Sequence, residues 1–180
     1  YIIIILLCVL FSFGALAQQL LPDSMAIAFN QAQNDSVKFK VSRAIYTFYE
    51  ETNRDSALYY ASLRYDIARK YKRRIEESYL QGQMAYQQIY LGRFSEALTN
   101  LSEAIQIATD SKEVSTWELT LFNTPGKSRE ITLSMLNHMY GHLKLQTGST
   151  ESIHYFKEGR RIGMEIGNDF RVTVGDMVLA

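Results

Sequence analysis

Apolar residues recur at helical spacing through most of the chain after residue 36. In the clearest stretch, one face carries Leu80, Met84, Ala85 and Ile89, which are separated by four, one and four positions. The stretch is broken at Gly92, and a glycine there can adopt the positive φ that ends a helix. The pattern predicts an amphipathic helix that ends near Gly92.

A second amphipathic helix is predicted directly after this break. Ser95 is the expected N-cap, and Glu96 would lie favourably in the first turn, near the positive end of the helix dipole. The expected buried stripe consists of Ala97, Leu98, Leu101, Ala104, Ile105 and Ala108. Together the two helices predict one antiparallel pair.

The same plan occurs before and after this pair. Before it, a helix is predicted from about residue 37 to 51, and Asp55 is the expected cap of a second helix that carries Ala57, forty residues before Ala97. After it, a helix over Ile131, Met135, Leu136, Met139 and Leu143 is expected to stop at Gly148, and its partner would be lined by Ile153, Phe156, Gly159, Ile162 and Ile166. Residues 172–180 would open a fourth copy, with Gly175 or Ala180 at its small position. A period of this length predicts an all-α solenoid of antiparallel helix pairs, with about three repeats and the start of a fourth.

Small residues recur where two helices of a pair are expected to cross. These positions are Ala85, Ala97, Ala104, Gly141, Ser152 and Gly159. A larger side chain at such a crossing would cost about 1–3 kcal/mol through overpacking.

The first 17 residues differ from the rest. They are almost purely apolar and end in Ala15-Leu16-Ala17, as in the apolar core and cleavage site of a secretory signal peptide. The alternative is an uncleaved membrane anchor, although the run is at the short limit for spanning a bilayer. We expect an exported protein with a signal peptide at 1–17, a polar leader at 18–36 and the repeat domain at 37–180.

Composition narrows the class of partner. The 19 basic and 19 acidic residues balance, so no electrostatic attraction to nucleic acid is expected. The single cysteine, Cys8, lies in the signal segment, which leaves no cysteine for disulfides, thiolate catalysis or zinc in the mature domain.

Residues 111–128 interrupt the pattern. Thr124-Pro125-Gly126 disfavours helix, whereas Trp117, Leu119, Leu121 and Phe122 are too apolar for a solvated loop. We expect an irregular connector that packs back over the array; a lid over a ligand is the alternative.

These residues resemble the tetratricopeptide (TPR) repeat. The small, Gly, aromatic, Ala, large, Ala series of that family is matched by Ala85, Gly92, Phe94, Ala97, Leu101 and Ala104. The family's terminal proline is replaced by Thr109, and the first copy has Ile45 and Arg64 where small residues are usual. The resemblance implies protein or peptide binding in a concave groove and no cofactor, but it does not identify a partner.

A looser resemblance is to exported TPR arrays of bacterial signalling proteins, in which Asp-Ser-Ala-Leu-Tyr-Tyr-Ala runs such as Asp55 to Ala61 are common. It implies an extracytoplasmic sensory region followed by a membrane helix and a histidine-kinase or DNA-binding output module. A free-standing periplasmic or surface scaffold is the alternative.

The TPR resemblance also implies which side chains face the groove. They are Tyr46, Tyr49, Tyr79, Tyr86, Tyr90, His138 and His142. A tyrosine ring covers apolar area and still offers a hydroxyl, which suits recognition. The alternative is that half of these tyrosines pack between helices.

Other chemistry is weakly indicated. His138 and His142 have a metal-binding spacing but lack the glutamate of a zinc-protease motif, so groove lining or a hydrogen-bonded buried histidine is preferred to a metal site. The run Lys70, Lys72, Arg73 and Arg74 is interpreted as a solvated turn and not as a phosphate site, because Glu76 and Glu77 follow it. No nucleophile elbow or phosphate loop occurs, and we expect no enzyme in this segment.

Overall fold

The computed structural model describes residues 21–110, 115 and 117–179. These residues form helices, turns and irregular segments without strands, which confirms the all-α prediction. The α-helices are α2 (Asp23–Asn30), α3 (Asp35–Tyr49), α4 (Arg54–Lys70), α5 (Arg74–Tyr90), α6 (Phe94–Asp110), α7 (Ser128–Gln146), α8 (Ser152–Glu165) and α9 (Asp169–Leu179). A short 3-10 helix, η1 (Pro125–Lys127), precedes α7.

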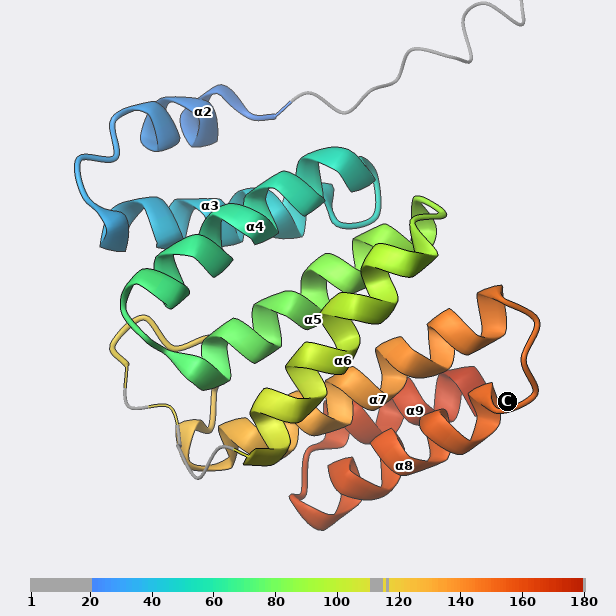
Figure 1. The fold of residues 1–180 in the computed structure, drawn as a ribbon. Coiled ribbons are helices and arrows are strands. Elements are labelled where there is room, and N and C mark those ends of the chain that lie inside the picture. The colour runs from blue at the N-terminus through green and yellow to red at the C-terminus, as the bar shows by residue number, and fades with distance from the viewer. Residues whose placement is uncertain (1–20, 111–114, 116, 180) are drawn as a thin grey trace, which may run out of the picture.

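Consecutive helices pack as antiparallel pairs, α3 with α4, α5 with α6 and α7 with α8, and α9 follows against α8 (Figure 1). The pairs stack because α4 packs on α5, and α7 packs on both α5 and α6. The array therefore has an inner layer of first helices, α3, α5 and α7, and an outer layer of second helices. The predicted solenoid of helix pairs is confirmed.

Small residues hold the pairs together as predicted. Ala85, Ala97 and Ala104 have no exposed surface. A Cβ added to Gly141 would lie 2.5 Å from the ring of Phe156, and one added to Gly159 would lie 2.8 Å from the backbone oxygen of Ser134. The helices of a pair cross too closely for larger residues at these positions.

Helix ends follow local chemistry, with two corrections. Gly92 has φ +73° and Gly148 φ +75°, so both glycines end helices as predicted. The cap of α4 is Asn53 and not Asp55, because Asn53 has an extended backbone and its Oδ1 accepts the Ser56 N–H at 3.0 Å. Ser95 does not cap α6, because that helix already begins at Phe94.

Two residues of the expected buried stripes are exposed. Leu98 is 45% exposed and Ile153 is 53% exposed. Each neighbours a residue that does face the partner helix, Ala97 and Ser152 respectively, and one step along a helix turns a side chain by about 100°. The buried stripes of these two helices are therefore narrower than their apolar positions predict.

The leader contains a helix that the sequence pattern does not predict, α2 at Asp23–Asn30, and α3 begins at Asp35. The expected signal segment, residues 1–17, lies outside the described residues. Among the helices that the structure describes, none combines the length and the apolar character needed to cross a bilayer.

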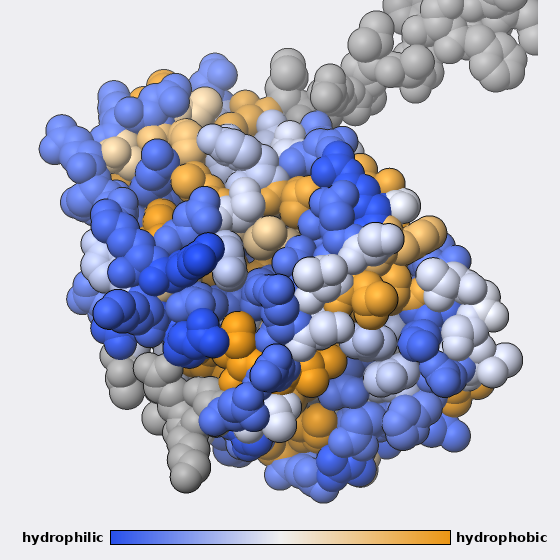
Figure 2. Space-filling view, viewed as in Figure 1, coloured by the Kyte–Doolittle hydropathy of each residue, from blue (hydrophilic) through white to orange (hydrophobic). Residues whose placement is uncertain are grey.

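The largest buried apolar cluster runs from Phe39 in α3 through α4, α5, α6 and the connector to Leu143 in α7. On the outer face, hydrophilic residues separate the apolar areas into patches (Figure 2). The core thus lies between the helix layers and continues under the connector.

Candidate functional site

The connector covers part of the inner layer of helices. The ring of Trp117 lies 5.0 Å from Phe39 and 5.9 Å from Tyr71, and Phe122 lies 5.2 Å from Tyr79, measured between centroids. Trp117 and Phe122 are both buried. The expected packing of this segment over the array is confirmed, and the chain itself occupies the inner face beside α3 and the start of α5.

Polar contacts fix one end of the connector. The Ser115 N–H donates to the Ser128 Oγ at 2.8 Å, and the Ser115 hydroxyl bonds to the buried Glu76 carboxylate. The Ser115 Oγ also lies 2.8 Å from the Thr120 Oγ1. Since buried polar groups are costly without partners, these bonds help hold the connector in this position.

Tyr46 does not line an open groove, in contrast to the expectation. It is 3% exposed, its hydroxyl accepts the Gln87 amide at 3.1 Å, and the Arg64 guanidinium lies 4.7 Å from its ring centroid. Burial is the main reason that the pKa of Tyr46 is raised above its usual value. This tyrosine therefore serves helix packing, with Arg64 packed against its ring where a small residue is usual in the repeat.

His138 is also buried, at 1% exposed. Its Nδ1 lies 2.9 Å from the Ser134 carbonyl oxygen, which can only accept, so Nδ1 carries the proton in the neutral ring. Burial lowers the His138 pKa to about 4. Gly159 packs directly against this imidazole, which places His138 in the crossing of α7 and α8 and not in a groove.

Tyr49 and Tyr79 are partly buried in aromatic contacts. The ring of Tyr49 stacks on Tyr60 of α4 with centroids 6.4 Å apart, and Tyr79 meets Phe122 of the connector edge-on. Both contacts are with this chain's own side chains. Neither tyrosine is the centre of an open surface.

The remaining predicted residues come together at the other end of α5. We call Glu51, Arg54, Tyr86, Tyr90 and His142 the tyrosine–histidine patch. The rings of Tyr86 and Tyr90 lie 4.9 Å apart, and the Tyr90 hydroxyl lies 3.4 Å from the His142 Nδ1. Three of the predicted residues, from two repeats, thus meet on one surface beside Glu51 and Arg54 of the first repeat.

Charged groups frame the aromatic part of the patch. The Arg54 guanidinium lies 4.6 Å from the Tyr90 ring centroid and 5.3 Å from that of Tyr86. The Tyr86 hydroxyl donates to Glu51 at 3.2 Å, and Arg54 forms an ion pair with Glu51 at 2.6 Å. This arrangement orients ring faces and hydroxyls toward a common surface, where Tyr90 is 40% exposed.

Burial keeps Tyr86 and His142 of the patch uncharged near neutral pH. Burial, with the neighbouring Tyr90 and Glu51, raises the pKa of Tyr86 above its usual value. Burial also lowers the pKa of His142. Near neutral pH the patch therefore offers neutral hydrogen-bonding groups and ring faces beside one cation and one carboxylate.

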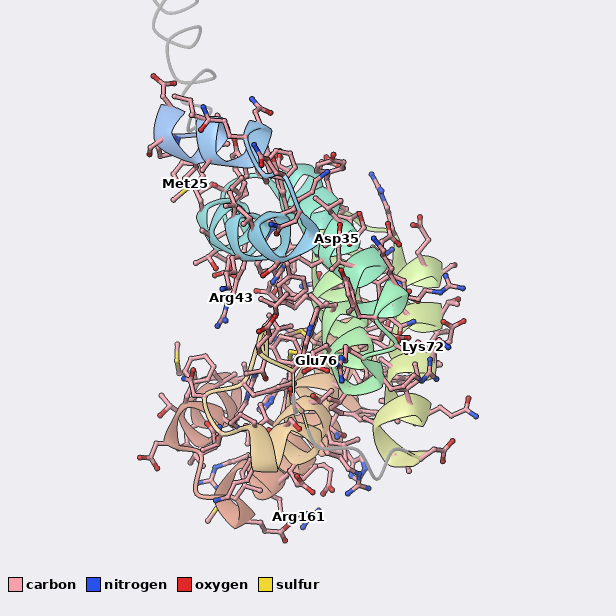
Figure 3. The ribbon with its side chains drawn as sticks, turned by 90° about the vertical axis from the view of Figure 1, so that its left-hand side faces the viewer. Met25, Asp35, Arg43, Lys72, Glu76 and Arg161 are labelled. Carbon is pink, nitrogen blue, oxygen red and sulfur yellow. The ribbon has the colours of Figure 1, made fainter. Side chains whose placement is uncertain are left out.

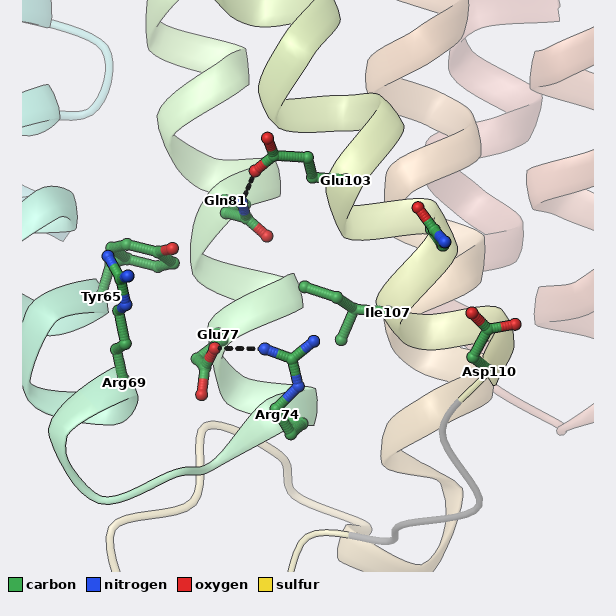
Figure 4. A pocket seen from close by; sticks show the side chains of 9 residues that line it. Tyr65, Arg69, Arg74, Glu77, Gln81, Glu103, Ile107 and Asp110 are labelled. Atoms are coloured by element: carbon green, nitrogen blue, oxygen red, sulfur yellow. Dashed lines mark hydrogen bonds and ion pairs between the residues drawn. The ribbon is translucent and has the colours of Figure 1, made fainter.

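The structure also contains an outer groove of about 580 Å³ that the sequence pattern does not predict. It lies between α4 and α6 and is floored by α5 (Figure 4). Part of its polar lining is paired internally, since Arg74 contacts Glu77 at 3.0 Å and the Gln81 amide donates to Glu103 at 3.0 Å. The sequence of a single repeat does not predict this groove, because residues of three helices form it.

The residues described give little support for a metal site or a phosphate site. They contain no group of three or more His, Cys, Asp or Glu side chains that could hold a metal. In the basic run, Lys70 pairs with Asp35 at 2.5 Å, Arg74 with Glu77, and Arg73 stacks on Trp117 at 5.9 Å. These cations belong to the packing of the turn between α4 and α5.

Comparison with known proteins agrees with this architecture. The family model described as the SusR N-terminal TPR domain matches residues 23–116, just over half of the 180 residues. No match was found among curated proteins or among solved structures. The matched segment begins at α2, reaches into the connector and includes the first two helix pairs. The chain is a helical-repeat protein of the protein-interaction type, and it belongs to the SusR N-terminal TPR domain family.

Proposed function

We propose that this chain binds a protein or peptide segment at the tyrosine–histidine patch. The observation that carries the proposal is the convergence of Tyr86, Tyr90 and His142 from two repeats on a surface the connector leaves open. Interfaces are enriched in tyrosine and arginine, and rigid rings lose little entropy on binding. An extended segment would pack its apolar side chains on the rings of this patch and form hydrogen bonds from its backbone amides to the hydroxyls.

Selection of peptides from a display library against the purified protein tests this proposal. We expect bound peptides to lose affinity by roughly tenfold or more on Tyr90→Ala, as at an interface hot spot. Tyr59→Ala is the matched control, because Tyr59 is 56% exposed on α4, outside the patch. Equal affinities for wild type, Tyr90→Ala and Tyr59→Ala would contradict a binding role for the patch.

We further propose that the domain is the extracytoplasmic sensory or interaction region of a larger signalling protein of the sensor histidine-kinase type. The apolar segment at 1–17 and the Asp-Ser-Ala-Leu-Tyr-Tyr-Ala run support export and this class, and the matching family is described as an N-terminal domain. A free-standing exported scaffold is the alternative. The full reading frame of the gene discriminates: a membrane helix and an output module are expected downstream, and a nearby stop codon without a membrane helix favours the scaffold.

We also propose that this segment has no catalytic activity of its own. His138 is engaged in packing, and His142 contacts the Phe156 ring and the Tyr90 hydroxyl without a carboxylate beside it among the hydrogen bonds described. Broad activity screens of the fragment test this. An activity that disappears on His142→Ala would overturn the proposal.

A further inference from the structure

Three arginine side chains line the inner face beside the connector, and none of them forms an ion pair with a residue that the structure describes. Arg64 of α4 is 1% exposed and Arg171 of α9 is 8% exposed, while Arg43 of α3 is exposed. Among the residues described, no Asp or Glu oxygen lies within 4 Å of their nitrogens. Buried cations are normally paired, so this cluster is unusual.

The three arginines line two adjoining cavities. One, of about 190 Å³, is bounded by Arg43, Arg64, Tyr79 and Leu121 among others, and the second, of about 230 Å³, by Arg43, Arg171, Tyr79 and Leu121. Because Arg43, Tyr79 and Leu121 border both, the cavities lie side by side. Figure 3 shows Arg43 projecting from α3 on the side of the molecule away from α4 and α6.

The polar groups of these arginines are only partly satisfied. Arg64 donates to the Gln83 Oε1 at 2.8 Å and to the Tyr60 carbonyl oxygen at 3.3 Å, both neutral acceptors. The Nε of Arg171 is buried and has no hydrogen-bond partner among the residues described. An unpartnered guanidinium N–H beside a cavity points to a ligand that accepts hydrogen bonds.

The charges on the cavity walls indicate which chemical class of ligand would bind there. The larger cavity is lined by two arginines and no acidic residue, and the smaller one by two arginines and Glu50. Aromatic rings, Tyr46, Tyr79, Phe122 and Phe170, supply the apolar walls. The guanidinium fork matches a carboxylate, and the small volume of each cavity fits a short carbon skeleton better than a protein segment.

We propose that these cavities form a binding site for a small organic acid, whose carboxylate groups are bound by Arg43, Arg64 and Arg171. The site is separate from the tyrosine–histidine patch and does not depend on peptide binding there. Leu121 and Phe122 of the connector form part of its wall, so the same segment that covers the inner face also shapes the site.

Calorimetric titration of the whole chain with succinate, and with the uncharged isostere succinamide, tests the proposal. We expect saturable binding of succinate and none of succinamide. Arg43→Gln should weaken succinate binding by about tenfold, because it removes a charged hydrogen-bond donor while replacing an exposed side chain that packing does not require. Arg171→Gln is a second variant that should also weaken succinate binding. Arg64 is not substituted, because it packs on Tyr46.

Arg69→Gln is the matched control, since Arg69 is an exposed arginine of α4 in the outer groove. Tyr90→Ala should leave succinate binding unchanged, which separates this site from the proposed peptide surface. Equal binding of succinate and succinamide, or equal effects of Arg43→Gln and Arg69→Gln, would overturn the proposal. So would Arg43-dependent binding of acetyl-Gly-Asp-Gly-amide or inorganic phosphate without binding of succinate, because the site would then recognise a peptide side chain or phosphate.

Discussion

Gly159 lets α8 cross α7 at a distance that excludes a side chain. An added Cβ would meet the Ser134 carbonyl and the His138 ring at 2.8 Å. We expect Gly159→Ala to lower the free energy of unfolding by about 1–3 kcal/mol, because backbone must shift to relieve the contact. Gly126→Ala is the control, since its added Cβ meets nothing within 4 Å, and its unfolding curve in urea should be close to wild type. Equal midpoints for the two variants would show that the crossing has room for a side chain.

His138 makes the stability of this crossing sensitive to pH. Its pKa falls from an ordinary 6.5 to about 4 on folding, so the folded state disfavours the protonated ring. The stability that the neutral ring contributes is therefore present above pH 6.5 and is lost as the pH falls toward 4, by no more than about 3 kcal/mol. His138→Asn should flatten this part of the pH profile of unfolding, whereas His154→Asn, at an exposed residue, should not. Parallel profiles for wild type and His138→Asn would contradict this effect.

Single residues also mark the limit of sequence-based prediction. The sequence predicts Ala97, Gly141 and Gly159 as crossing residues, because small residues that recur at helical spacing are typical of closely packed helices. The TPR resemblance implies that Tyr46 and His138 face a groove, whereas both are buried. Helical periodicity identifies a face, but only the distances between neighbouring helices decide whether that face is open.

At the scale of the helix, the first turn of α4 gives a direct test of capping. Asn53→Ala should lower the free energy of unfolding by about 1 kcal/mol, because it removes the acceptor of the Ser56 N–H. Asp55→Ala should change it by less than about 0.5 kcal/mol, since its ion pair with Arg93 is largely exposed. Chemical denaturation of both variants distinguishes the two caps, and a larger loss for Asp55→Ala would restore the sequence-based assignment.

The connector shows how far element prediction extends. Its apolar residues predict that it packs on the array, as it does. They do not predict that Trp117 packs on Phe39, because α3 lies more than sixty residues earlier in the chain. The same limit applies to α2, whose short apolar pattern in a polar leader does not predict a helix.

At the scale of the molecule, the array and its connector divide the inner face into two parts. One part, beside α3 and α5, is covered by the connector and contains the arginine-lined cavities. The other, near the end of α5, exposes the tyrosine–histidine patch. The repeat pattern predicts that such a face exists, whereas the division depends on an irregular segment that no repeat pattern describes.

Both proposed binding surfaces depend on the connector lying where the structure places it, and Trp117 reports on this directly because it is the single tryptophan of the chain. Acrylamide quenching of its fluorescence is the decisive measurement. At 8% exposed, native Trp117 should emit at shorter wavelength and be quenched several-fold less than in the protein unfolded in guanidinium chloride. Native emission and quenching equal to those of the unfolded protein would contradict a connector packed on α3 and α5.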